Sequence, residues 1–225
     1  DALWAKNESL FYQLVADCHA YHESILNGLF DTSAEPIFTE VKDVFDRLLA
    51  RIKEPIGENY DFEYDQIVSL GEVLSTLIVT AFLKQDGHQA VWADARKLIR
   101  TNNQYRDANV DWTKTKQAIS ERVVPLLDSA DCVITQGFLG HTSEGFTTTL
   151  GREGSDYTAG ILAYCLDAES VTIWKDVPGM LNADPKWFDD TIKLDQISFK
   201  EAIELSYYGA SVIHPKTIKP LQNKN

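Results

Sequence analysis

The sequence predicts an α/β domain, built as a three-layer αβα sandwich around a central and mostly parallel sheet. Short apolar runs typical of strands alternate along the chain with segments in which apolar residues recur at helical spacing. This alternation is typical of a parallel sheet that helices cover on both faces. Of the 225 residues, 44% are hydrophobic, which is enough for one large core. No linker-like segment divides the chain, so we expect one domain over residues 1–225.

Six segments are predicted as helices. In most of them apolar residues recur every three or four positions, as on the buried face of a helix. Ser69 and Glu72 form a capping box, which predicts that the third helix begins at Ser69, and Asp86-Gly87 ends it. The polar stretch 55–65 before it is expected to be a surface connection. The predicted helices are residues 1–29, 41–52, 69–85, 114–127, 157–166 and 201–208.

Three short segments are predicted as strands, because they are apolar runs bounded by polar residues or glycine. They are residues 90–92, 131–136 and 171–174. Open parallel sheets bind ligands at the carboxyl ends of their strands. The loops that follow residues 136 and 174 are therefore the first places to look for chemistry.

Composition narrows the classes of partner. The formal net charge of −13, without a basic stripe, argues against binding to nucleic acid or to an anionic membrane. No run approaches the roughly 18 consecutive apolar residues of a membrane helix, and no signal peptide opens the chain. Three cysteines without CxxC spacing favour a reducing compartment, so we expect a cytoplasmic protein. Because Asp1 stands where an initiator Met would, we expect the 225 residues to be part of a longer protein.

The segment from Gly151 to Ser155 has the residue types of an anion site. Two glycines flank Arg152, and Ser155 is predicted as the N-cap of the next helix, with Asp156 in its first turn. Free amide groups at a helix N-terminus attract anions, and a guanidinium matches a carboxylate or phosphate. A simple loop-to-helix junction would account for Ser155 and Asp156, but it would not account for an arginine between two glycines.

Residues 174–186 are open to two interpretations. They hold a Pro-Gly turn that would suit any domain surface, but they also place Asp176 between lysines after a predicted strand, where ribose or phosphate could bind. The glycines of residues 137–140 lack the G-x-G-x-x-G pattern, and the sequence contains no P-loop. His19 and His22 share a helix but have no third ligand in sight, so no metal site is expected.

Together these segments resemble the amino acid kinase family, and within it the aspartate kinases. The order and spacing of the matching blocks also agree, and the resemblance covers about residues 65–220. The matching blocks are residues 69–76, 134–138, 149–159, 175–180 and 208–217.

The resemblance implies phosphoryl transfer from ATP, with Mg²⁺, to the side-chain carboxylate of L-aspartate. The product is 4-phospho-L-aspartate, in the first step of lysine, threonine and methionine biosynthesis. By position, Glu72 would bind the substrate ammonium group, Arg152 its carboxylate, and Ser155 would help to hold it. Asp156 would organise the catalytic centre, and a homo-oligomer is implied. The positions that would contact ATP are Lys175, Asp176, Leu181, Lys186, Ser211 and Val212.

Two departures from the family pattern matter. The family opens with a strand that ends in Lys-Phe-Gly-Gly-Thr-Ser, and these 225 residues contain no such segment. We therefore expect little or no kinase activity from this chain alone. Many members also have Lys where this chain has Ser211, although Lys216 is nearby. The ligand-binding regulatory domains that usually follow are not part of this sequence.

Three alternatives stay open from the sequence. The chain could belong to a kinase of another small acceptor, such as glutamate, acetylglutamate or a nucleoside monophosphate. It could also be a catalytically incomplete domain that binds an amino acid or a nucleotide. A NAD-dependent dehydrogenase is disfavoured, because the glycine fingerprint and its following acidic residue are missing.

Overall fold

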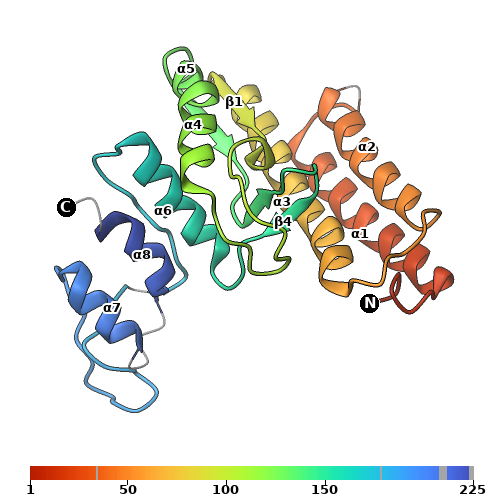
Figure 1. Ribbon diagram of the computed structural model, residues 1–225. Helices are drawn as coiled ribbons and strands as arrows, with labels where there is room; N and C mark the ends of the chain where they lie inside the picture. The colour runs from red at the N-terminus through yellow and green to blue at the C-terminus, as the bar shows by residue number, and fades with distance from the viewer. Residues whose placement is uncertain (34, 178, 208–211, 223–225) are drawn as a thin grey trace.

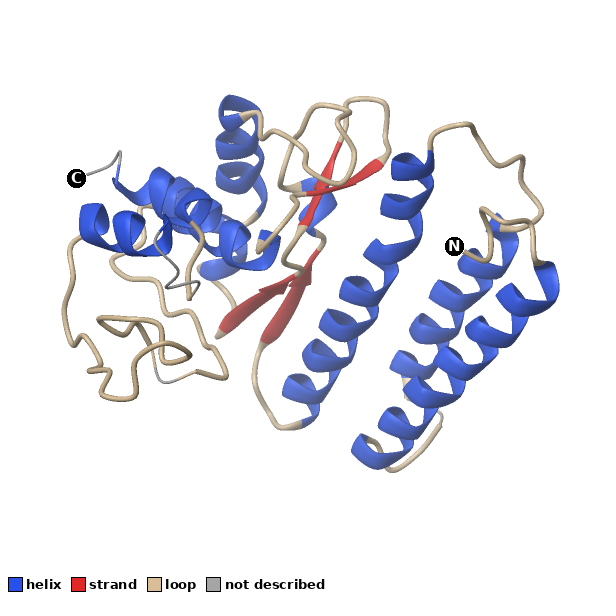
Figure 2. Cartoon of the chain, turned by 90° about the horizontal axis from the view of Figure 1, so that it is seen from below, coloured by secondary structure: helices blue, strands red, loops and turns tan. Residues whose placement is uncertain are grey.

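A computed structural model describes residues 1–225 except residues 34, 178, 208–211 and 223–225. Three long helices lie side by side at one end of the molecule, short strands lie in the middle, and the remaining helices lie at the other end (Figures 1 and 2). The three long helices are α1 (Glu8–Leu29), α2 (Pro36–Arg51) and α3 (Tyr60–Gln85). The others are α4 (Trp112–Arg122), α5 (Val124–Leu127), α6 (Gly154–Leu166), α7 (Phe199–Tyr207) and α8 (Pro215–Gln222), with a 3₁₀ turn η1 (Ala95–Lys97).

The strands form two short sheets in the described part of the chain. β1 (Ala90–Ala93) runs parallel to β2 (Cys132–Thr135), as the sequence predicts for these two segments. β3 (Leu139–His141) runs antiparallel to β4 (Thr147–Thr149), and neither was predicted. The prediction of a strand at residues 171–174 is wrong, because these residues form no ladder.

The order of layers agrees with the predicted α/β class. Successive residues of a strand point to opposite faces, and β1 illustrates this: Trp92 packs into the core under α1–α3, whereas Ala93 belongs to the core under α4 and α6. The sheet therefore lies between two helical layers. Trp92 also donates a hydrogen bond from Nε1 to Thr76 Oγ1 of α3 at 2.9 Å, which fixes β1 on that helix.

Helix α3 begins nine residues before its predicted start. Asn59 is the N-cap, and its side chain accepts a hydrogen bond from the amide of Phe62. Ser69 is buried inside the helix and donates to the carbonyl of Gln66, so the predicted capping box is wrong. The polar segment before Ser69 is helical because its acids find partners on other elements. Glu63, for example, forms a buried ion pair with Arg51 of α2.

Apolar spacing in residues 1–29 predicts a buried face that includes Leu10, Leu14, Ile25 and Leu29, and in the first half of α1 the buried face is shifted from it by one residue. Leu10 and Leu14 are exposed, whereas Phe11 and Val15 are buried against the neighbouring helices. Both pairs have helical spacing, so spacing alone did not distinguish them.

Helix α8 packs directly on α6. A Cβ at Gly160 of α6 would lie 2.7 Å from the carbonyl oxygen of Thr217 of α8, so only glycine permits this approach. The sequence did not predict α8. Between α6 and α7, residues 168–198 contain no helix and, apart from a bridge between Leu181 and Lys193, no strand pairing among the residues described there.

By its length and composition, α3 could cross a membrane, and it is the one helix of the described residues that meets this test. It also contacts α2, β1 and β4 and carries buried Glu63 and Asp65. We interpret it as a helix that packs within the α/β domain.

Candidate functional site

The loop that opens α6 has a backbone that few residues could adopt. Gly151 has φ +77°, and Glu153 has φ +52° in the left-handed region. Glu153, rather than Ser155, is the residue that precedes the helix, so the predicted N-cap is wrong. Ser155 instead lies exposed in the first turn, beside Asp156. The N-terminus of α6 is therefore not capped by a side chain. The Gly154 amide donates to the carbonyl of Gly151 at 3.0 Å, which leaves the amides of Ser155 and Asp156 as the ones that could bind a ligand.

Two glycines bring the loop after β2 against this helix start. A Cβ at Gly137 would lie 2.8 Å from Cα of Ser155, and one at Gly154 would lie 2.5 Å from the ring of Phe138. The Phe138 amide also donates to Thr158 Oγ1 at 2.9 Å. The carboxyl end of β2 and the start of α6 thus form one unit, as expected for a site in an α/β fold.

Asp156 makes the contact that joins two predicted motifs. Its carboxylate lies 2.6 Å from Nζ of Lys175, with the two side chains 14% and 26% exposed. The hydrogen bond to Asp156 is the main cause that raises the pKa of Lys175. The first turn of α6 and Lys175 therefore meet in space, although 19 positions separate Asp156 from Lys175.

Glu72 lies on α3, linked to this unit through Thr76. Thr76 Oγ1 donates to the Glu72 carbonyl at 2.9 Å and accepts from Nε2 of Gln136 at 3.0 Å. Gln136 directly precedes Gly137, which touches Ser155. The Glu72 side chain is half-buried, and burial raises its pKa. Within the described residues, the Glu72 carboxylate forms no ion pair with Arg152.

Arg152 is exposed, and its guanidinium has no hydrogen-bond or ion-pair partner in the described part of the chain. A guanidinium in this state can take a carboxylate or phosphate without breaking a protein contact. Its direction depends on the backbone of the Gly151 loop.

The other predicted nucleotide contacts differ in their exposure. Asp176 and Lys186 are exposed, and Leu181 is partly buried next to its bridge with Lys193. Val212 is partly buried, and Ser211 lies outside the described residues. Among the predicted site residues, Lys175 is the one that the structure joins to α6 by an ion pair.

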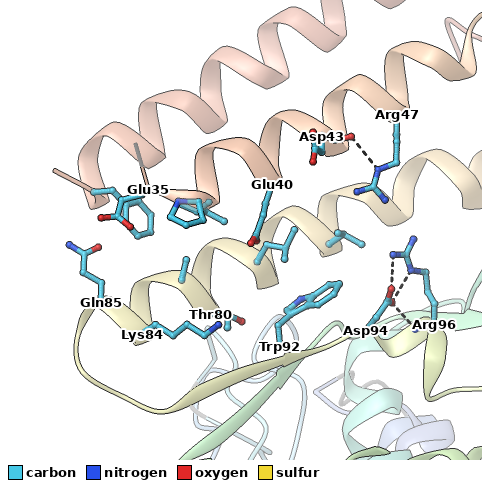
Figure 3. A pocket seen from close by; sticks show the side chains of 16 residues that line it. Glu35, Glu40, Asp43, Arg47, Thr80, Lys84, Gln85, Trp92, Asp94 and Arg96 are labelled. Carbon is cyan, nitrogen blue, oxygen red and sulfur yellow. Dashed lines mark hydrogen bonds and ion pairs between the residues drawn. The ribbon is translucent and has the colours of Figure 1, made fainter. Parts of the chain in front are cut away.

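A cavity of about 710 Å³ lies elsewhere, between α2, α3 and β1 (Figure 3). Trp92 lies on one side of it, and the ion pair of Asp94 with Arg96 lies near one end. Burial alone would raise the pKa of Asp94, but the hydrogen bonds and charge of Arg96 outweigh burial and lower it. None of the predicted site residues lines this cavity. No motif in the sequence pointed to it, because it depends on how α2 packs against α3.

Comparison with known proteins places these features in context. The model of the amino acid kinase family matches residues 16–225. The chain is 44% identical, over 69% of its length, to lysine-sensitive aspartokinase 3 of Escherichia coli, and 30% identical, over 95%, to a bifunctional aspartokinase/homoserine dehydrogenase of Buchnera aphidicola. Its structure matches E. coli aspartokinase III in complex with aspartate and ADP, with a TM-score of 0.85 and 33% identity over 94% of this chain.

The chain is shorter than each of these proteins. It spans 34% of the E. coli relative, 25% of the Buchnera relative and 47% of the solved chain.

Proposed function

The chain belongs to the amino acid kinase family. From this premise we propose that these residues form part of the catalytic domain of an aspartate kinase. The reaction is phosphoryl transfer from MgATP to the side-chain carboxylate of L-aspartate. The observation that carries the proposal is the contact of Asp156 with Lys175, because it joins the Arg152 loop to the predicted nucleotide segment. The similarity to an aspartokinase whose structure holds aspartate and ADP supports the same pair of substrates.

The charges of the site suit an amino-acid substrate. In this proposal the guanidinium of Arg152 binds the α-carboxylate, and the carboxylate of Glu72 binds the ammonium group. Burial raises the pKa of Glu72, and a bound ammonium group would favour its ionised form again. Ser155 contributes a hydroxyl from the first turn of α6.

Phosphoryl transfer requires that the two substrates are positioned and that the charge of the phosphates is neutralised. A side-chain carboxylate oxygen of aspartate attacks the γ-phosphorus of ATP, the bond from phosphorus to the bridging oxygen breaks, and ADP leaves with that electron pair. Lys175 would neutralise phosphate charge while Asp156 holds its ammonium group in place. The remaining proposed nucleotide contacts are Asp176, Leu181, Lys186, Ser211 and Val212.

Magnesium enters this scheme as part of the nucleotide substrate. Mg²⁺ in such sites is held by phosphate oxygens and one or two carboxylates. Asp156 fits that role, because its carboxylate lies at the junction of the two motifs. In the described ranges no group of three His, Cys, Asp or Glu side chains gathers, so the phosphates would supply most of the ligands.

Binding of L-aspartate to the 225-residue chain, measured by calorimetry, tests the proposal. We expect binding that Arg152→Met weakens about 100-fold, because the charge-assisted contact to the carboxylate is lost. Arg152→Lys should weaken binding less than Arg152→Met does, since lysine keeps the charge although it lacks the planar fork. Lys116→Met, at an exposed position of α4, is a charge-matched control. Absence of aspartate binding to the wild-type chain would overturn the proposal.

An acceptor panel and a turnover assay separate the alternatives. Tighter binding of glutamate than of aspartate would favour a kinase of another acceptor. Because these residues hold no Lys-Phe-Gly-Gly-Thr-Ser segment, we expect aspartate binding with little ADP release from MgATP by this chain alone. Normal turnover would contradict that expectation.

For the parent protein we propose a cytoplasmic homo-oligomer that acts at the start of lysine, threonine and methionine biosynthesis. Similarity to aspartokinases supports the biosynthetic role. The cytoplasmic location is proposed from the sequence, and the homo-oligomer from the family resemblance. Light scattering of the purified parent protein would test its assembly.

A further inference from the structure

Lys216 of α8 reaches the base of the Arg152 loop with three contacts. Its Nζ donates to the carbonyl of Leu150 at 2.9 Å and to Oδ1 of Asp107 at 2.7 Å. The same ammonium group lies 5.0 Å from the ring centre of Tyr157 in α6. We propose that Lys216 is a positioning residue that fixes the direction of Arg152, an inference that rests on the proposed function of that arginine.

Asp107 transmits this contact to the backbone of the loop. A Cβ at Gly151 would lie 2.4 Å from Oδ1 of Asp107, the same oxygen that accepts from Lys216. Asp107 therefore lies directly against the residue before Arg152. The positive φ of Gly151 is held in place by a carboxylate that Lys216 neutralises.

Asp65 forms a second anchor on the other side of the loop. Because of it, Lys216 affects the direction of the Arg152 side chain rather than the stability of the fold. Asp65 of α3 accepts from the amides of Arg106 and Thr149, at 2.9 Å each. Lys216 contacts the next residue in each segment, Asp107 and Leu150. The two anchors hold the paired segments from opposite elements, and loss of Lys216 leaves the Asp65 anchor intact.

The position of Lys216 also ties the substrate loop to the nucleotide segment. Lys216 follows the proposed nucleotide contact Val212 by four residues, and α8 is fixed to α6 at Gly160 and Thr217. Val212 lies three residues before the start of α8 at Pro215, so Lys216 brings the substrate loop close, along the chain, to the proposed nucleotide segment. Lys216 is the described side chain that connects α8 with that loop by hydrogen bonds.

Hydrogen exchange followed by mass spectrometry tests the proposal on the 225-residue chain without depending on activity. In Lys216→Met we expect exchange of the hydrogen-bonded amides of Leu150 and Gly154, which donate to the carbonyls of Phe138 and Gly151, to become about tenfold faster, because a local opening is no longer opposed. Lys216→Arg should restore most of the protection, since it keeps the charge near Asp107. Lys219→Met, an exposed change on the same helix, is the matched control and should leave exchange unchanged.

Two outcomes overturn the proposal. Unchanged exchange at the amides of Leu150 and Gly154 in Lys216→Met would show that the loop does not depend on this lysine. Faster exchange spread equally over α6 and α8 would show that Lys216 has only a general structural role.

Calorimetry links the loop to its ligand. We expect the Kd for L-aspartate to rise about tenfold in Lys216→Met, because misplacement of a binding group costs affinity, while the Kd for a non-hydrolysable ATP analogue changes far less. If the wild-type chain binds no aspartate, the proposed function fails, and the exchange result still decides whether Lys216 holds the loop.

Discussion

Asp65 shows how much a single buried carboxylate contributes to this structure. Its side chain is fully buried and accepts hydrogen bonds from the amides of Arg106 and Thr149 and from Thr149 Oγ1. Burial raises the pKa of Asp65, and these three hydrogen bonds only partly oppose that effect. The carboxylate thus orders the segments that lead to the Arg152 loop while its charge carries a desolvation cost.

At neutral pH, Asp65→Asn should raise the free energy of unfolding, whereas Asp65→Ala should lower it. An asparagine can accept from both amides through its carbonyl oxygen and donate from its amide group to Thr149 Oγ1, so the network survives without a charge. Alanine leaves three buried donors unsatisfied, and we expect it to lower the free energy of unfolding by about 3 kcal/mol. Urea unfolding at pH 7 measures both. A lower free energy of unfolding for Asp65→Asn than for Asp65→Ala would contradict this interpretation.

The pH dependence of the same pair follows from the raised pKa of Asp65. The folded state keeps its proton to a higher pH than the unfolded state, whose ordinary value is 3.8. Wild-type stability from this group is therefore present at low pH and is lost as the pH rises through the folded-state pKa. Asp65→Asn has no carboxyl group to titrate, so its stability does not fall in this way. The difference in free energy of unfolding between Asp65→Asn and the wild type should therefore grow from about pH 4 upward. Urea unfolding between pH 4 and 8 tests the slope, and a constant difference would refute it.

At the residue scale, the sequence indicates which residue types could form a site but not which of them touch. Arg152 and Asp156 follow from the residue types of their loop, but the ion pair of Asp156 with Lys175 depends on the path of the chain between them. The N-cap was placed at Ser155 because serine caps helices well. Glu153 has a left-handed backbone, which residues other than glycine rarely adopt. Its residue type therefore gave no indication that the helix begins directly after it.

At the element scale, a local apolar signal correctly predicted β1 and β2 but failed at residues 171–174, and elements that depend on tertiary partners were missed. β1 and β2 are apolar runs, and both form. The first turns of α3 are polar, and they are helical because Glu63 and Asp65 bond to α2 and β4. α8, with Pro220 inside it, is weak by propensity and depends on its packing against α6.

Two helical glycines offer a matched test of element packing. A Cβ added at Gly71 of α3 would meet no atom within 4 Å, whereas a Cβ at Gly160 of α6 would meet the Thr217 carbonyl at 2.7 Å. Gly71→Ala should raise the free energy of unfolding by about 0.5–1 kcal/mol through helix propensity. Gly160→Ala should lower it by about 1–3 kcal/mol through overpacking. Thermal and urea unfolding compare them, and equal effects would show that α8 does not press on α6.

At the scale of the whole molecule, two hydrophobic cores lie on either side of β1 and β2. One holds α1–α3 together and the other lies between α4 and α6. The α/β class was predicted because alternation of strands and helices is a property of the whole sequence. The extent of the sheet was not, because the segment at 171–174 is apolar in sequence but finds no neighbouring strand to pair with among the described residues.

Residues 168–198 differ from both cores, and this difference predicts where the molecule opens first. Trp174 and Trp187 are 90% and 82% exposed, in a segment whose described residues form no helix. Few buried apolar contacts mean low local stability. Brief chymotrypsin treatment should therefore cut after these two residues before it cuts α1, whose Tyr12 and Tyr21 are exposed but helical.

Ligands should slow these cuts if this segment binds the nucleotide. Lys175 and Lys186 flank the cleavage positions, and a ligand that binds only the ordered segment stabilises it by about 2.7 kcal/mol at 100 times its Kd. We expect a non-hydrolysable MgATP analogue to slow cleavage after Trp174 and Trp187, and L-aspartate alone to slow it less. Cleavage after Trp4, far along the chain from the site, is the internal control and should not change. Equal protection at all three positions would indicate inhibition of the protease, and no protection at Trp174 would remove residues 175–186 from the nucleotide site.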